Sequence, residues 1–275
     1  VLGQDNRAFG AACIAAPQVR VLFISGGGAV GQAYAKTAAA FDKLIFAGPS
    51  GMPAAILSAG TPIETAVRYL LRRAFINAGQ YCTTIKKAYI ATDLYEEVKE
   101  ALLDLLPEIK AGPPEDPEAW LGPLKVTRTR RLLQEALKQL RDPHYLTTFS
   151  LEADLVPPII CELAEVPDLE VFGPFLALIR VKDGAEGIIR AIQTRYPFAV
   201  SVFGEVTPAE EQRLRDAFGM VYLNPDFTFT PLRLPFGGKG DSGWILEWHQ
   251  GRCRRRDGAF LYSAELVRPN GTATP

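Results

Sequence analysis

Histidine and cysteine are scarce in this chain of 275 residues, which contains two histidines and four cysteines. The cysteines lie far apart, without a Cys-x-x-Cys pair, so the usual spacing of a zinc site is absent. Because only two histidines could add ligands, we expect no metal site. Few, scattered cysteines are typical of reduced thiols, and we expect a cytoplasmic protein. The four are Cys13, Cys82, Cys161 and Cys253.

Net charge and long apolar runs are also nearly absent. The formal net charge is -1 at pH 7, so nothing favours attraction to nucleic acid or to an acidic membrane surface. No apolar stretch reaches the roughly 18 residues needed to span a bilayer, and no signal-peptide pattern is present. The basic run 252–256 is interrupted by Cys253 and predicts a solvated surface turn. A small-molecule substrate is therefore the expected partner.

What the chain does have is an alternation of short apolar runs with amphipathic segments. Strands are predicted at 20–25, 43–47, 86–92, 156–161, 175–181, 199–203, 221–223 and 260–267. Helices are predicted at 32–41, 62–74, 93–106, 127–141, 186–194 and 208–218. Alternating strands and helices predict an α/β fold around an open, mostly parallel sheet.

A glycine turn follows the first predicted strand and precedes a predicted helix. Its Gly26-x-Gly28-x-x-Gly31 pattern fits the dinucleotide fingerprint, in which glycines let the backbone approach a pyrophosphate at a helix N-terminus. The fingerprint also expects an acidic residue about 20 positions later, and none lies near position 51. Two interpretations stay open: a dinucleotide site, or a glycine turn with a purely structural role.

The cysteine at position 82 stands in a distinctive context. Residues 75–82 read Phe-Ile-Asn-Ala-Gly-Gln-Tyr-Cys. A single intracellular cysteine is more often a small buried hydrophobe than a catalyst. Here the preceding glycine permits a tight turn, which can present the thiol at the end of an element.

Further motifs follow in order along the chain. They are Trp-Leu-Gly-Pro-Leu at 120–124, Glu-Val-Phe-Gly-Pro at 170–174, Gly-Met-Val-Tyr-Leu-Asn at 219–224 and Pro-Phe-Gly-Gly-Lys-Gly-Asp-Ser-Gly at 235–243. Together with the cysteine motif, this series resembles the NAD(P)-dependent aldehyde dehydrogenase superfamily, which includes the pyrroline-5-carboxylate dehydrogenases. The resemblance covers nearly the whole chain, although the lysine of the last motif lies one position early.

The resemblance implies a chemistry and a set of roles. Cys82 would be the nucleophile that forms a thiohemiacetal and then a thioester with an aldehyde or semialdehyde, and NAD or NADP would be the cofactor. Glu170 would hold the nicotinamide ribose, and Phe172 would pack near the nicotinamide. Three positions of the glycine turn would contact the dinucleotide, namely Ser25, Gly26 and Gly31.

The resemblance also implies an architecture. Residues 1–58 would be a partial, Rossmann-like coenzyme domain that lacks its upstream part, and residues 59–243 would be the catalytic cysteine domain. Residues 244–275 would return to the coenzyme domain and add a strand for assembly, so a homo-oligomer is expected. Phe227, Phe229 and Trp244 would either line the mouth of the aldehyde pocket or belong to the core.

One departure from the family bears on activity. Its general base, a glutamate about 34 residues before the cysteine, is replaced here by Ala47 or Gly48. The turn 48–51, Gly-Pro-Ser-Gly, resembles that of acylating relatives, which pass the acyl group to coenzyme A. Three functions therefore remain open: an aldehyde dehydrogenase, an impaired relative, or an acylating enzyme. An activated Cys82 is expected to react with iodoacetamide near neutral pH far faster than Cys13 or Cys161.

Overall fold

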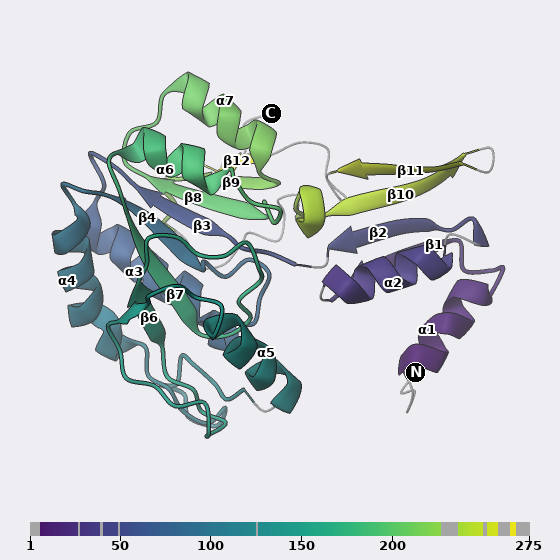
Figure 1. The fold of residues 1–275 in the computed structure, drawn as a ribbon, viewed down its shortest axis with the longest axis horizontal. Coiled ribbons are helices and arrows are strands. Elements are labelled where there is room, and N and C mark those ends of the chain that lie inside the picture. Colours follow the sequence, from purple (N-terminus) through teal and green to yellow (C-terminus); the bar gives the residue numbers. More distant parts are fainter. Residues whose placement is uncertain are drawn as a thin grey trace.

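The chain folds around two separate β-sheets, as seen in a computed structural model (Figure 1). The structure describes residues 6–26, 28–38, 41–48, 50–124, 126–226, 236–249, 252–257 and 265–267. The smaller sheet has four strands in the order β1-β2-β10-β11. The larger sheet has eight, in the order β12-β9-β8-β3-β4-β7-β6-β5. The α/β class predicted from the sequence is confirmed.

The smaller sheet combines the beginning of the chain with a late hairpin. Its strands are β1 (Val21–Ser25), β2 (Leu44–Gly48), β10 (Trp244–His249) and β11 (Arg252–Asp257). The first two are parallel, and β10 joins β2 in the antiparallel sense. Two helices accompany this sheet, α1 (Asn6–Ala15) and α2 (Gly28–Ala38). Trp244 packs into the small core of this sheet and is only 4% exposed, so it does not line a pocket mouth.

The prediction of a surface turn in the basic run 252–256 is wrong. These residues belong to β11, which pairs antiparallel with β10 from Trp244↔Asp257 to His249↔Arg252. Arginines lack the alternating apolar pattern that marks a half-buried strand, so the local signal was missing. Backbone pairing with β10 holds this segment extended instead.

The larger sheet is parallel except at one edge, where β5 runs antiparallel to β6. Its central strands are buried on both faces, which is typical of a parallel sheet covered by helices. The strands are β3 (Ala54–Leu57), β4 (Lys87–Ala91), β5 (His144–Tyr145), β6 (Ile159–Glu162), β7 (Phe175–Val181), β8 (Ala199–Phe203), β9 (Met220–Leu223) and β12 (Glu265–Val267).

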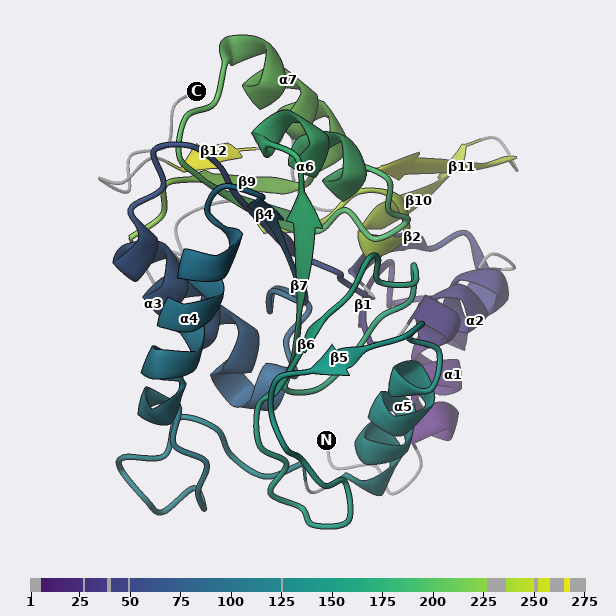
Figure 2. The same ribbon diagram turned by 60° about the vertical axis from the view of Figure 1, so that its left-hand side comes forward.

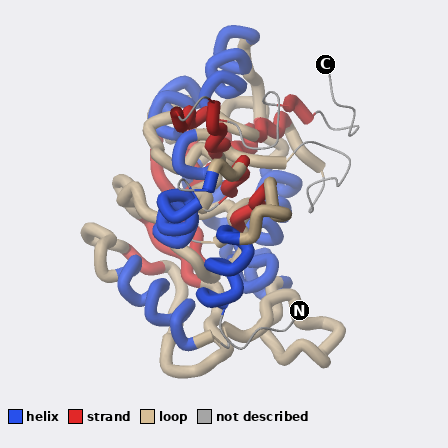
Figure 3. Tube along the Cα trace, turned by 90° about the vertical axis from the view of Figure 1, so that its right-hand side faces the viewer, coloured by secondary structure: helices blue, strands red, loops and turns tan. Residues whose placement is uncertain are grey.

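Helices cover both faces of the larger sheet (Figures 1 and 2). The helices α3 and α4 lie on one face, whereas α6 and α7 lie on the other. Loops make up much of the chain between α4 and β6, apart from α5 and the short β5 (Figure 3). These helices are α3 (Ile63–Phe75), α4 (Tyr95–Leu105), α5 (Thr127–Leu137), α6 (Gly184–Ala191) and α7 (Pro208–Ala217).

The chain passes from one sheet to the other between β2 and β3. The strand β2 ends at Gly48 in the smaller sheet, and β3 begins at Ala54 in the larger one, where it pairs with β4 and β8. The late strands β10 and β11 lie in the smaller sheet. The last strand, β12, pairs with β9.

Candidate active site

The chemistry-bearing residues meet at the amino ends of the parallel strands of the larger sheet. Cys82 precedes β4, and the 170–174 segment precedes β7. Because neighbouring strands β4 and β7 run parallel, these two loops lie at the same edge of the sheet. The carboxyl end of β1 faces them, and a cavity of about 450 Å³ lies between. It is lined by Ser25, Gly26, Val30, Gly48, Gln80, Tyr81, Cys82, Arg128, Thr129, Leu132, Glu170 and Phe172.

Five of the six predicted site residues line this one cavity. Gly31 does not: it is buried within α2 and is not among the lining residues. Phe227 and Phe229 lie outside the described residues.

A strained turn presents the cysteine. Residues Ile76–Gly79 form a single 3₁₀ turn, in which Asn77 (φ 50°) and Ala78 (φ 52°) adopt left-handed conformations. For residues with a side chain this costs about 1 kcal/mol or more each. Backbone strain of this kind is concentrated at functional sites, where surrounding contacts hold it in place. The turn is therefore held by other residues.

Hydrogen bonds from buried side chains supply that support. Thr84 Oγ1 contacts the carbonyl oxygens of Gly79 at 3.2 Å and Tyr81 at 2.7 Å. An Arg73 guanidinium N–H donates to the carbonyl of Thr83 at 2.9 Å. These bonds join the cysteine turn to α3 and to the segment that enters β4.

Glu170 is joined to the cysteine through the turn at 50–51. The backbone N–H of Gly51 donates to Glu170 Oε1 at 3.0 Å, and the Ser50 side chain also hydrogen-bonds this carboxylate. A Cβ atom added at Gly51 would lie 2.0 Å from the carbonyl oxygen of Cys82. Only glycine fits at this position, so Gly51 contacts both the Glu170 carboxylate and the backbone of Cys82.

Burial controls the protonation of both groups. Burial, and to a smaller extent the nearby Glu170 carboxylate, raise the pKa of the Cys82 thiol to about 11. Backbone N–H groups and the charge of Arg73 oppose this rise only in part. Burial likewise raises the pKa of Glu170, and the charge of Lys86 is among the causes that oppose it. With this pKa, Cys82 is a thiol at neutral pH in the free protein.

Apolar side chains surround the other side of the sulfur. Cys82 packs against a buried cluster of Phe198, Ala199, Met220 and Tyr222. The ring of Phe236 stands edge-on to Phe198, with 5.2 Å between centroids. The glycine loop 236–243 therefore reaches the neighbourhood of Cys82.

The positions that correspond to the family's glutamate base carry no ionisable group at this cavity. Gly48 lines it, Ala47 is fully buried, and neither carries an ionisable group. Of the described residues that line the cavity, Glu170 is the one carboxylate and Arg128 the one cation. Arg128 and Thr129, at the start of α5, were missed because nothing local in the sequence places that helix at the cavity.

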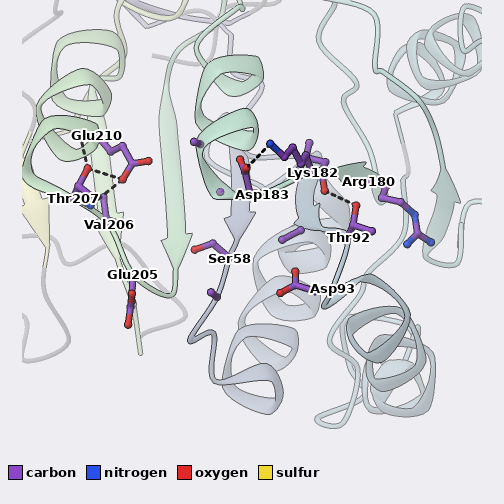
Figure 4. Close-up of a pocket in the computed structure, with 15 residues that line it drawn as sticks. Ser58, Thr92, Asp93, Arg180, Lys182, Asp183, Glu205, Val206, Thr207 and Glu210 are labelled. Carbon is purple, nitrogen blue, oxygen red and sulfur yellow. Dashed lines mark hydrogen bonds and ion pairs between the residues drawn. The ribbon is translucent and has the colours of Figure 1, made fainter.

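A larger cavity, of about 1230 Å³, lies at the opposite end of the same strands (Figure 4). Open α/β sheets usually bind ligands there, outside the carboxyl ends. Several of its charged side chains, however, are engaged in helix caps and ion pairs. Asp183 accepts from the N–H of Glu186 and caps α6, and Thr207 with Glu210 forms the capping box of α7. Arg180 pairs with Glu96. The candidate active site is the smaller cavity.

The described part of the chain contains neither a metal-binding cluster nor a membrane-spanning helix. No group of three or more His, Cys, Asp or Glu residues there is arranged to hold a metal ion. Among the same residues, no helix combines the length and apolar character required to cross a membrane.

Comparisons with known proteins agree with this geometry. Two curated relatives are N-succinylglutamate 5-semialdehyde dehydrogenases. That of Novosphingobium aromaticivorans is 31% identical over 192 residues, covering 66% of this chain and 41% of the relative. That of Cronobacter sakazakii is 30% identical over 260 residues, covering 88% and 52%. The chain thus spans about half the length of the curated relatives it matches.

Solved structures share the fold. An NADP-dependent glyceraldehyde-3-phosphate dehydrogenase from Bacillus halodurans C-125 superposes with a TM-score of 0.79 at 22% identity, over 94% of this chain and 56% of that one. A succinate-semialdehyde dehydrogenase from Burkholderia pseudomallei gives 0.79 at 22% identity, over 94% and 57%. The model of the aldehyde dehydrogenase family matches residues 1–251. The chain belongs to the aldehyde dehydrogenase family.

Proposed function

We propose that this chain is the cysteine-bearing part of an NAD(P)-dependent semialdehyde dehydrogenase, with Cys82 as its nucleophile. The observation that carries the proposal is the shared cavity, in which Cys82, Glu170 and Phe172 meet Ser25 and Gly26 of the other sheet. The two curated relatives are named as semialdehyde dehydrogenases, which supports this substrate class.

The cavity has features that fit a dinucleotide. Ser25 and Gly26 end β1 and precede α2, and a helix N-terminus favours phosphate charge. Glu170 would hold a ribose, Phe172 would pack beside the nicotinamide, and Arg128 suits an anionic group. The oxidised cofactor would supply a hydride acceptor and a positive charge.

Residues of this chain would have separate roles in the reaction with the aldehyde. The sulfur of Cys82 would attack the carbonyl carbon as a thiolate, after its proton has passed to solvent. The backbone N–H of Cys82 would donate to the resulting oxyanion. Once the hydride has been given up to the oxidised cofactor, the acyl group would be held on Cys82 as a thioester. The apolar cluster around Phe198 covers one side of Cys82.

The acyl group can leave Cys82 in two ways, by hydrolysis or by transfer to another thiol. Without the family's base, hydrolysis is expected to be slower by about 100- to 10,000-fold, which is what a general base contributes. We propose that transfer to the thiol of coenzyme A outruns hydrolysis. A catalytically impaired protein is the second candidate, favoured by the absence of that base.

The test is to incubate the purified chain with succinic semialdehyde and NAD or NADP, with and without coenzyme A. Cofactor reduction and acyl adducts on Cys82 are followed by absorbance and mass spectrometry, with Cys82→Ser as the control. A coenzyme A-dependent increase in turnover supports acyl transfer. Equal rates with and without it refute the transfer, and no cofactor binding or adduct refutes the dehydrogenase.

We further propose a homo-oligomer, since β12 is the outermost strand of the larger sheet. We also propose a cytoplasmic location, which the free thiols of Cys13, Cys82 and Cys161 support. Light scattering on the purified chain tests the assembly, and a monomer over the whole concentration range would contradict it.

A further inference from the structure

A buried lysine lies directly beneath the junction of the two active-site loops. Lys86 is 1% exposed and stands at the entrance to β4, just after the cysteine turn. Its ammonium group donates to the carbonyl oxygen of Gly79 at 2.7 Å and to that of Gly173 at 2.6 Å. Gly79 belongs to the turn that presents Cys82, and Gly173 to the motif that begins with Glu170.

The two loops meet here backbone to backbone. A Cβ atom added at Gly79 would lie 1.9 Å from the carbonyl oxygen of Gly173 and 2.8 Å from Lys86 Nζ. Each carbonyl oxygen also accepts a second hydrogen bond, Gly79 from Thr84 Oγ1 and Gly173 from the N–H of Phe175. Two carbonyl oxygens directed at one point nevertheless repel each other, and a cation between them offsets this repulsion.

This arrangement is costly for the fold. Burial lowers the pKa of Lys86 to about 7, and the negative charge of Glu170 acts against that change. Burying a cation disfavours its charged form, and an apolar side chain of similar volume would avoid this cost. The contribution of the lysine is therefore to geometry at the junction rather than to overall stability.

We propose that Lys86 is a positioning residue, whose ammonium group ties the Cys82 turn to the Glu170 loop and so fixes the separation of their reactive side chains. It does not touch the substrate itself. The inference rests on the proposed function, in which Cys82 and Glu170 act together.

The electrostatic coupling between Cys82 and Glu170 reports on this separation. The carboxylate raises the pKa of the thiol, so Glu170→Gln is expected to accelerate thiol modification at a fixed pH. The ratio of the two rates measures the coupling. Removing the Lys86 hydrogen bonds that join the two loops should reduce this ratio, whereas a general loss of folding stability should not.

The experiment measures modification of Cys82 by methyl methanethiosulfonate at pH 6, where Lys86 is charged, in a double-mutant cycle of Glu170→Gln with Lys86→Met. Lys87→Met is the matched control, because Lys87 is the next residue, is 4% exposed, and contacts the ring of Tyr89 rather than the site loops. Lys86→Arg keeps the charge and offers two donors to the two carbonyls.

In the wild-type and Lys87→Met backgrounds, Glu170→Gln is expected to raise the rate by about threefold or more, a pKa change of about half a unit. In Lys86→Met the ratio should approach one, and Lys86→Arg should restore it. A full ratio in Lys86→Met would overturn the proposal. Should Lys86→Met not fold, a folded Lys86→Arg variant without coupling would overturn it and one with coupling would support it.

These outcomes are independent of the dehydrogenase assay. A protein that forms a thioester but keeps full coupling in Lys86→Met disproves the role of Lys86 alone. A protein that shows the expected cycle but neither binds cofactor nor forms an adduct disproves the proposed function alone.

Discussion

The protonation of Cys82 offers the sharpest prediction about the site. Burial and the Glu170 carboxylate raise the pKa of this thiol from 9.0 to about 11. Each pKa unit changes the thiolate fraction tenfold well below the pKa, so Cys82 carries about 100-fold less thiolate at pH 7 than an ordinary cysteine. Alkylation by iodoacetamide should therefore be slow at pH 7 and rise about tenfold per pH unit up to pH 10.

Replacing Glu170 by Gln removes one of the two causes. Burial is the larger cause, so we expect an acceleration that is more than about threefold but well short of the full 100-fold. A saturating oxidised cofactor, which carries a positive charge, should accelerate the reaction in the same direction.

The assay follows alkylation by mass spectrometry of the tryptic peptide that contains residue 82, with Cys82→Ser to identify the label. Cys161, whose pKa burial raises to about 12, is an internal control that should react more slowly. A plateau at or below pH 8.5 in the free protein, or no effect of Glu170→Gln, would refute the reasoning.

Three further predictions concern stability, each checked by urea unfolding. Gly79→Ala should lower the free energy of unfolding by about 2 kcal/mol or more, since the added Cβ would overlap the carbonyl oxygen of Gly173 at 1.9 Å and separate the loops. Gly122→Ala, whose added Cβ meets nothing within 4 Å, should change it by less than about 0.5 kcal/mol. Similar losses in the two variants would contradict the close packing at Gly79. Stability should rise with pH from about 7 to about 8, by up to about 1.4 kcal/mol per unit, because the unfolded chain keeps the proton that folded Lys86 loses. Near pH 9 the raised pKa values of Cys82 and Cys161 begin to act in the opposite direction. Lys86→Met should reduce the slope between pH 7 and 8, and an unchanged slope there would contradict the assignment. Thr207→Ala should cost about 1 kcal/mol by removing the capping box of α7, and an unchanged midpoint would contradict that contribution.

Much of the fold could be predicted because its signals are local. The strands at 175–181 and 199–203 match their predicted limits, since apolar, β-branched runs bounded by turns specify buried strands. The helix predicted from 93 is α4, and its apolar residues recur at the helical period. The sequence pattern did not predict β11, where pairing with β10 holds an arginine-rich segment extended.

The residues of the candidate site were predicted from motifs, but the relation between them was not. The Gly-Gln-Tyr-Cys turn and the Glu-Val-Phe-Gly-Pro segment are visible in the sequence, and each is a local backbone arrangement. Nothing in either motif indicates that Lys86 joins them, because Lys86 and Lys87 are equivalent as neighbouring lysines until the sheet sets which one lies beneath the loops.

The sequence alone indicated most of the elements, their order and the motif that contains Cys82, because turns, strands and helices depend on near neighbours. Only the tertiary structure decided that Glu170 raises the pKa of Cys82, that Gly31 lies outside the lining of the cavity, and that Lys86 is buried between two carbonyl oxygens. Burial and distance set those properties, and both arise only when parallel strands bring remote segments to one edge of the sheet.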